Sequence, residues 1–357
     1  MARIDSFLRL VTEQGVSDLH FHSGAPPSIR HDGGLQPLPF RALSETEARR
    51  FLYEMLDGAQ RAQLEANKQI DFLYVAEGAG RFRANVFLHS RGLGAVFRII
   101  RPAPPTLDDM MLPPVFRRLT QLNNGLVLVT GPTGSGKSTT LAALVHEINR
   151  TSARHIITVE DPIEVLHAPL QSVISQRQVE KHAETFASAL RASLRESPDV
   201  LVVGEMRDHE TVSLALSAAE TGVLVLGTLH TNSAAKAVDR IIDMVPPETR
   251  EQTRGLLSVL LRCVASQHLC RRADGKGRVA VMEVLLHTYA VANMIREGKA
   301  HQIDAYLQTA GADGSGMISL DASIARAVRS GSITLEEGLR VASYPDQVQA
   351  LAGEVAG

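Results

Sequence analysis

The sequence predicts an α/β domain with a mostly parallel, doubly wound sheet, preceded by a smaller α+β domain. The pattern Gly-x-x-x-x-Gly-Lys-Ser stands between an apolar run at residues 125–130, typical of a buried strand, and a helical pattern at residues 140–148. Further along the chain, apolar strand patterns alternate with helical ones, which is the order that gives parallel strands with crossover helices. A chain of 357 residues is long enough for two domains.

The first 100 residues lack a phosphate-binding motif and predict the α+β domain, at residues 1–100. Apolar positions 4, 7, 8 and 11 have helical spacing, and Ser44 with Glu47 forms a capping box that opens a second helix. Strand or hairpin patterns occupy residues 17–22, 28–38, 71–74, 81–88 and 94–100. The hairpin turns at Asp32-Gly33. Three histidines are expected to face solvent rather than bind a metal: His20, His22 and His31.

A proline-rich segment at residues 101–112 predicts an extended, semi-rigid linker between the two domains. The nucleotide-binding core is then expected at residues 113–357. Its last part, from about residue 285 to 357, has helical patterns.

Composition excludes several classes of protein. The net charge of −2 and the lack of a basic, aromatic-laced segment argue against a nucleic-acid partner. No run of 18 apolar residues and no apolar signal core occur, so a cytoplasmic protein is expected. Cys263 and Cys270 lie seven apart in an apolar pattern that we interpret as helical, and no Cys-x-x-Cys pair exists. Two core cysteines and no zinc site are therefore expected.

The Gly-Lys-Ser motif has the chemistry of a phosphate-binding loop. Its glycines let backbone N–H groups converge on phosphate oxygens, and the following helix adds the partial positive charge of its N-terminus. Lys137 is expected to bridge the β- and γ-phosphates, and Ser138 to hold Mg²⁺. The predicted nucleotide-binding residues are Gly131, Pro132, Thr133, Gly134, Ser135, Gly136, Lys137, Ser138 and Thr139.

Polar residues follow three predicted strands, at the edge of the sheet where ligands bind in open parallel sheets. Glu205 is expected to polarise an attacking water, directly or through a Mg²⁺-bound water. Glu164 is a candidate general base, while Glu160 or Asp161 organises Mg²⁺ waters. For Glu160, Asp161 and Glu164, the alternative is that each belongs to a solvated acidic turn without a catalytic role. His230 either senses the γ-phosphate or hydrogen-bonds the turn that contains it.

Two pairs of arginines are candidates for completing the site from a neighbouring subunit. Arg191 and Arg195 are four residues apart on a predicted helix at residues 186–195. They either act as arginine fingers or belong to a solvated surface. Arg81 and Arg83 alternate on a predicted strand, so both point to the same side, as an anion-binding pair would.

Together these motifs resemble those of the secretion ATPases of the GspE/PilT family, and within it the retraction motors of type IV pili. The resemblance covers nearly the whole chain. Residues 131–139 match the Walker A box, 159–164 the Asp box, 198–208 the Walker B box and 221–232 the His box. Residues 80–87 are similar to the strand that supplies arginines to a neighbouring subunit in that family.

The resemblance implies a RecA-like core with a PAS-like N-terminal domain, ATP and Mg²⁺ as ligands, and a homo-hexameric ring. It implies an ATPase that powers pilus retraction and twitching motility. As partners it implies an inner-membrane pilus platform protein of the PilC type and a sister retraction ATPase. The protein would then work at the inner face of the cytoplasmic membrane.

Alternatives within this resemblance stay open. Residues 290–297 are similar to a motif linked to retraction, but Ala292 stands where the family has Arg. Val223 replaces a usual His, and His268 a usual Arg. These departures leave open whether the chain is a principal retraction motor or an accessory paralogue of the PilU kind. Chain length and the lack of a four-cysteine site argue against an extension motor. Lys137 and Glu205 argue against a non-catalytic, nucleotide-binding regulatory ring.

Overall fold

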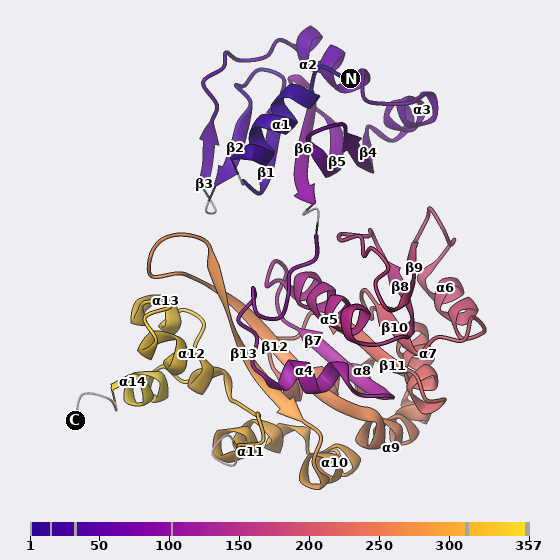
Figure 1. The fold of residues 1–357 in the computed structure, drawn as a ribbon, viewed down its shortest axis with the longest axis vertical. Helices are drawn as coiled ribbons and strands as arrows, with labels where there is room; N and C mark the ends of the chain where they lie inside the picture. Colours follow the sequence, from indigo (N-terminus) through magenta and orange to yellow (C-terminus); the bar gives the residue numbers. More distant parts are fainter. Residues whose placement is uncertain (1, 15, 32–33, 101–102, 311–313, 354–357) are drawn as a thin grey trace. The chain divides into compact units, whose positions relative to one another are not determined.

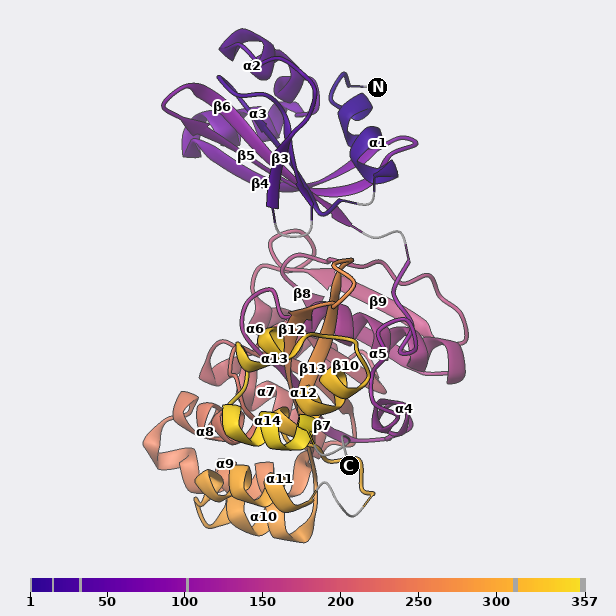
Figure 2. The same cartoon turned by 90° about the vertical axis from the view of Figure 1, so that its left-hand side faces the viewer.

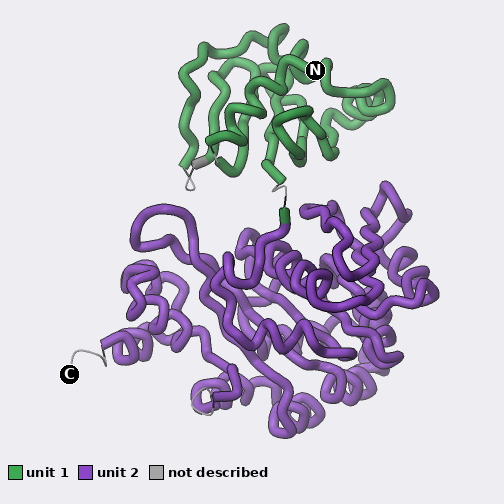
Figure 3. The backbone as a smooth tube through the Cα atoms, in the orientation of Figure 1, with its two compact units in different colours: residues 1–103 green, residues 104–357 purple. Residues whose placement is uncertain are grey.

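The computed structural model describes residues 2–14, 16–31, 34–100, 103–310 and 314–353. The chain divides into two compact units, Met1–Ala103 and Pro104–Gly357, which Figure 3 shows in different colours. The turn expected at Asp32-Gly33 and positions 101 and 102 of the expected linker lie outside the described residues. From Pro104 onward the chain belongs to the second unit, where Leu107 is buried beside Phe116.

Unit 1 is a six-stranded antiparallel sheet with helices packed on one face (Figure 1). The strand order is β3-β2-β1-β6-β5-β4. The strands are β1 (Asp18–His22), β2 (Ser28–His31), β3 (Gly34–Pro37), β4 (Gln69–Ala76), β5 (Gly80–His89) and β6 (Gly92–Ile100). The helices are α1 (Asp5–Glu13), α2 (Glu45–Tyr53) and α3 (Gly58–Asn67). The predicted capping box of Ser44 and Glu47 is confirmed at the start of α2.

The two faces of this sheet differ because side chains alternate along each strand. On β5, Phe82 is fully buried against the helices, whereas Arg81 and Arg83 alternate with the buried positions and are half-exposed. On β1, His20 and His22 alternate with buried residues in the same way. Their rings are half-buried and stack 5.9 Å apart, so these two histidines are less open to solvent than the sequence predicts.

Unit 2 is built on a seven-stranded sheet in the order β13-β12-β7-β11-β10-β8-β9. Every neighbouring pair is parallel except β12 with β13. The strands are β7 (Gly125–Thr130), β8 (His155–Glu160), β9 (Val173–Gln178), β10 (Val200–Val203), β11 (Leu224–Leu229), β12 (Leu261–Arg271) and β13 (Arg278–Leu286). The predicted parallel-rich sheet is therefore confirmed.

Helices cover both faces of this sheet, as Figures 1 and 2 show. One face packs on α4 (Val115–Thr120) and α5 (Lys137–Thr151). The other packs on α6 (Phe186–Ser193), α7 (His209–Glu220), α8 (Ala234–Met244) and α9 (Arg250–Leu260), the last preceded by the short helix η1 (Pro247–Thr249). The helical C-terminal segment comprises α10 (Tyr289–Arg296), η2 (Ala300–Gln302), α11 (Ile303–Ala310), α12 (Leu320–Arg329), α13 (Leu335–Leu339) and α14 (Pro345–Gly353). None of the helices in the described ranges is long and apolar enough to cross a membrane.

The helical interpretation of the segment around Cys263 and Cys270 is wrong, because these residues lie on strand β12. This strand pairs with β7 on one side and β13 on the other, and most of its residues are buried. A strand covered on both faces reads as a continuous apolar run, which local periodicity cannot distinguish from a buried helix. Both cysteines are free and buried, as expected of core residues.

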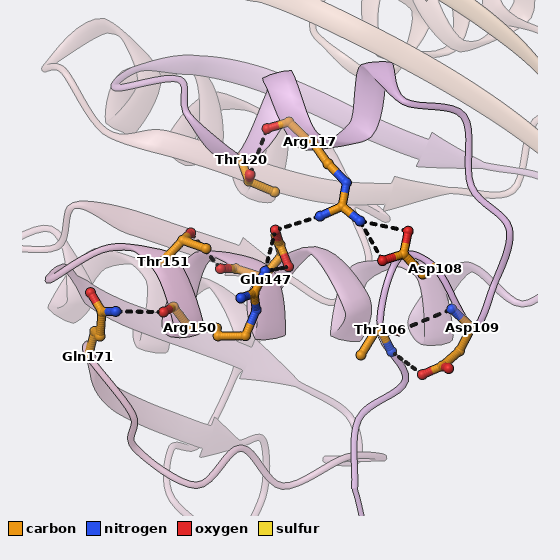
Figure 4. A network of polar contacts seen from close by, with 9 residues as sticks. All are labelled: Thr106, Asp108, Asp109, Arg117, Thr120, Glu147, Arg150, Thr151 and Gln171. Atoms are coloured by element: carbon orange, nitrogen blue, oxygen red, sulfur yellow. Dashed lines mark hydrogen bonds and ion pairs between the residues drawn. The ribbon is translucent and has the colours of Figure 1, made fainter.

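A polar network fastens the start of unit 2 to helix α5 (Figure 4). The guanidinium of Arg117 on α4 donates to Asp108 Oδ1 at 2.6 Å and to Glu147 Oε1 at 3.2 Å. Arg150 donates to the same carboxylate at 3.0 Å. Glu147 is buried on α5, so these two arginines compensate a charge that would otherwise be costly to bury. The chain that enters unit 2 is thereby attached to the helix that begins at the phosphate-binding loop.

Candidate nucleotide-binding and hydrolysis site

The phosphate-binding loop connects β7 to α5, with Lys137 as the first residue of the helix. Gly131 has φ +142°, and an added Cβ would lie 2.3 Å from the backbone oxygen of Gln267, so only glycine fits there. Gly136 caps the helix in the left-handed region, with φ +89°. This backbone leaves the first N–H groups of α5 available to an anion.

A continuous chain of polar contacts joins the ends of four strands. Lys137 Nζ donates to Gly131 O at 2.9 Å and lies 3.3 Å from His230 Nδ1. His230 Nε2 lies 3.0 Å from Glu205 Oε1. The other oxygen of Glu205 pairs with Arg207 at 2.8 Å, and Arg207 reaches Asp161 at 3.8 Å. Residues that follow β7, β8, β10 and β11 thus meet at one edge of the sheet, as the sequence predicts.

The partners of His230 define which of its ring nitrogens carries the proton. The Lys137 ammonium can only donate, so Nδ1 accepts from it. An ionised Glu205 carboxylate can only accept, so Nε2–H donates to it. His230 thus bridges the Lys137 ammonium and the Glu205 carboxylate, with one ring nitrogen facing each.

The charged side chains in this series of contacts shift one another's pKa values. Burial lowers the pKa of the Lys137 ammonium, whereas the carboxylates of Glu205 and Glu164 act in the opposite direction. For Glu205, burial acts to raise the pKa of the carboxyl, but the contacts with Arg207, His230 and Lys137 together outweigh it and lower the pKa. Glu205 is therefore ionised at neutral pH and can accept a proton or a hydrogen bond from water.

The backbone fixes Glu205 between its neighbouring strands. The N–H of Gly204, the residue before it, donates to Val159 O at 2.8 Å, and the N–H of Met206, the residue after it, donates to Thr228 O at 3.1 Å. Met206 is buried in the core under the sheet. The carboxylate is consequently held at the sheet edge by bonds on both sides of its own residue.

The donors expected for Mg²⁺ differ in their surroundings. Ser138 is exposed in the first turn of α5 beside Lys137, and Asp161 is exposed near Arg207. Glu160 accepts from Thr158 Oγ1 at 2.7 Å and Gln176 Nε2 at 3.2 Å, and burial raises the pKa of its carboxyl. Mg²⁺ usually takes one or two protein oxygens and completes its shell with water and phosphate. The Ser138 hydroxyl and the Asp161 carboxylate fit that requirement better than Glu160 does. Across the described residues, no three His, Cys, Asp or Glu side chains are grouped to hold a metal by themselves.

The remaining predicted residues lie outside this chain of contacts. Glu164 is exposed, although its charge acts on Lys137. Arg191 on α6 forms an exposed ion pair with Glu210 on α7, and Arg195 is exposed just after α6 ends. Arg81 and Arg83 belong to unit 1, where Arg83 lies 3.9 Å from Asp71.

Sequence reasoning missed the roles of Arg207, Gln267 and Glu283. Arg207 stands two residues after Glu205 in the Walker B segment, so its position was a usable signal. Gln267 on β12 contacts Ser135 of the phosphate-binding loop, and Glu283 on β13 contacts Ala234 at the start of α8, shortly after His230. No local pattern marks these two residues, because their contacts depend on how distant strands pair.

The departures from the family pattern occupy sheltered positions. Val223 and Ala292 are buried, where apolar side chains fit. His268 is half-buried, and it interacts with the backbone of Asn232, two residues after His230.

Glu283 makes the stability of unit 2 depend on pH. It accepts from Ala234 N, at the start of α8, at 2.7 Å. Burial raises the pKa of Glu283 to about 7, the bond from Ala234 opposes the shift, and Asp304 and Asp321 add to it. Between about pH 4.5 and 7 the folded chain binds a proton that the unfolded chain releases, so this group lowers stability as pH rises.

We expect Glu283→Gln, which keeps an acceptor for Ala234, to raise the free energy of unfolding at pH 7.5 by roughly 2 kcal/mol. At pH 4.5 the variant and the unmodified protein are expected to be similar. Thermal unfolding of both proteins between pH 4.5 and 8 measures this, with Glu220→Gln at an exposed position of α7 as control. Parallel stability curves for Glu283→Gln and the unmodified chain would contradict the prediction.

The fold and the site together define a phosphate-loop nucleotide hydrolase. A family model described as "Type II/IV secretion system protein" matches residues 4–340, and the chain belongs to this family. It is 43% identical, over 343 residues, to the type IV pilus retraction ATPase PilT of Pseudomonas aeruginosa, covering 96% of this chain and 99% of that protein. It is 46% identical, over 322 residues, to a twitching motility protein of Neisseria gonorrhoeae, covering 90% of this chain and 86% of that protein. The fold is similar to a crystal structure of the pilus retraction motor PilT with bound ADP, with a TM-score of 0.88 and 40% identity. The match covers 98% of this chain and 100% of that chain.

Proposed function

We propose that this protein is an ATP-hydrolysing motor that powers retraction of type IV pili and hence twitching motility. The observation that carries the proposal is the chain of contacts from Lys137 through His230 to Glu205 and Arg207, at the sheet edge that binds phosphate. A relative named as a pilus retraction ATPase, matched over nearly the full length of both chains, supports the choice of pilus over other secretion machines.

Within this proposal each residue has a chemical role. The phosphate-binding loop and Lys137 hold the phosphates, and Ser138 would hold Mg²⁺ together with Asp161, which would order water molecules around the ion. The ion would neutralise charge on the β- and γ-phosphates. Glu205 orients the attacking water, and the exposed Glu164 serves as general base. His230 senses the γ-phosphate because it lies between Lys137 and Glu205.

The proposed working form is a homo-hexameric ring. Arginines of a neighbouring subunit, namely Arg81 and Arg83 or Arg191 and Arg195, complete the charge compensation at the γ-phosphate. Such head-to-tail contacts must close on themselves, which favours a ring. Exposed positions for Arg191 and Arg195 and half-exposed ones for Arg81 and Arg83 are compatible with contacts to another subunit. The partners are the inner-membrane platform protein and a sister retraction ATPase, at the cytoplasmic face of the membrane.

Deletion of the gene tests whether the protein drives retraction or extension of pili. Cells without the protein are expected to keep surface pili and to lose twitching motility, because pili extend but do not retract. Complementation with the unmodified gene should restore twitching, and complementation with Glu205→Gln should not. Bald cells after deletion would assign the protein to extension instead. Unchanged twitching would assign it to an accessory role, which the departures at Val223, His268 and Ala292 make the second candidate.

A further inference from the structure

Strand β12 lies directly against the phosphate-binding loop. It pairs with β7 in parallel, with Ser266 opposite Thr130, so Gln267 lies beside the first residue of the loop. The missing Cβ of Gly131 would stand 2.3 Å from Gln267 O, and that of Gly136 would stand 2.9 Å from Gln267 Nε2. The backbone of Gln267 therefore requires glycine at position 131, whereas position 136 favours glycine because of its left-handed backbone, φ +89°, and lies beside the side chain of Gln267.

The side chain of Gln267 joins two parts of the nucleotide site. It is fully buried, with 0% of its surface exposed. Its Nε2 donates to Ser135 O at 2.6 Å, and its Oε1 accepts from Thr140 Oγ1 at 2.7 Å. Ser135 belongs to the loop and Thr140, also fully buried, to the first turn of α5. Lys137 and Ser138 lie between these two attachment points.

Only an amide satisfies both partners at this position. The backbone carbonyl of Ser135 can only accept, so it requires a donor, whereas the Thr140 hydroxyl donates here and requires an acceptor. A glutamate would set a negative oxygen against the carbonyl of Ser135. A methionine of similar length would leave two buried polar groups without partners, at a cost typical of unsatisfied buried groups.

We propose that Gln267 is a positioning residue for ATP hydrolysis, holding the loop and the first turn of α5 in the arrangement that binds phosphate. Gln267 acts through Ser135 and Thr140 and does not itself touch the nucleotide. This inference rests on the proposed ATPase function for its kinetic test, but its binding test, with ADP alone, is independent of hydrolysis.

The test uses the full-length chain and three substitutions. Gln267→Met is expected to weaken ADP binding and lower kcat/KM by about 10- to 100-fold, because Ser135 and Thr140 lose their shared partner. Thr140→Val removes one of the two bonds and is expected to cause part of that loss. In the double variant the effects should not add, since Thr140→Val removes a bond that Gln267→Met has already broken. Thr140→Ser keeps the hydroxyl and should recover most of the activity.

A matched control separates positioning from general destabilisation. Gln171 is an exposed glutamine that donates to Arg150 O, at the other end of α5, at 2.7 Å. Gln171→Met makes the same chemical change and is expected to leave ADP affinity unchanged. All measurements are made well below the unfolding temperature of each variant. If Gln267→Met fails to fold, Thr140→Val and its serine counterpart carry the test.

Normal ADP affinity in folded Gln267→Met, or in Thr140→Val if the first variant does not fold, would overturn the inference. Additive losses in the double variant would also overturn it. Absence of ATP hydrolysis by the unmodified protein, with ADP binding that depends on Gln267, would reject the proposed function and leave the positioning role in place.

Discussion

Glu205→Gln is expected to lower the rate of ATP hydrolysis by at least about 100-fold while changing ADP affinity by only a few-fold. The contacts with Arg207, His230 and Lys137 keep this carboxylate ionised, and the negative charge strengthens the hydrogen bond by which it orients the attacking water. Glutamine has nearly the same shape but lacks the negative charge. Phosphate release at saturating ATP and Mg²⁺ measures the effect.

The control for this prediction is a glutamate away from the site. Glu220 is exposed at the last residue of α7, and Glu220→Gln should hydrolyse ATP at the rate of the unmodified protein. Equal phosphate release from Glu205→Gln and the unmodified protein would remove Glu205 from the chemistry and leave the proposed motor without its hydrolytic centre.

Lys137→Gln is expected to weaken ATP binding by about 10- to 100-fold, because a charge-assisted hydrogen bond contributes roughly 1.5–3 kcal/mol. Lys137 is 8% exposed, so its ammonium acts in a sheltered environment where charge is little screened. The loss should be largest for ATP, smaller for ADP and smallest for adenosine, since the ammonium contacts phosphate only. Titration of each nucleotide with the purified variant measures this order.

Lys181→Gln, at an exposed position of the same unit, serves as the control and should bind all three ligands normally. A uniform loss across ATP, ADP and adenosine would indicate a misfolded loop rather than a missing phosphate contact. Unchanged affinity for ATP would contradict the assignment of residues 131–139 to phosphate binding.

The part of the site that sequence reasoning could reach depends on a general rule of parallel sheets. Glu205 and His230 each follow an apolar strand, and carboxyl ends of neighbouring parallel strands lie at one edge. Their proximity, with 3.0 Å between His230 Nε2 and Glu205 Oε1, needs no knowledge of distant packing. The phosphate-binding loop was predictable for the same reason, because its signal lies within nine consecutive residues.

Other features depend on contacts between distant segments. Gln267 and Ser135 are 132 positions apart, and no spacing rule connects a buried strand to a loop so far away. The error at Cys263 arose because β12 is covered on both faces and therefore shows no alternation. Glu160 was grouped with Asp161 by its position, but its strand neighbours Thr158 and Gln176 engage its carboxyl.

The contacts of Arg117 with Asp108 and Glu147 relate two distant parts of unit 2 through helix α5. Glu147 lies ten residues after Lys137 on the same helix, about 15 Å along its axis at 1.5 Å per residue. The N-terminus of this helix follows the phosphate-binding loop. Near its C-terminus, Glu147 is joined through Arg117 to Asp108, in the segment that leads into unit 2. The segment that leads into unit 2 and the loop that binds phosphate are therefore both attached to one helix, so their separation along that helix is set by its rise per residue.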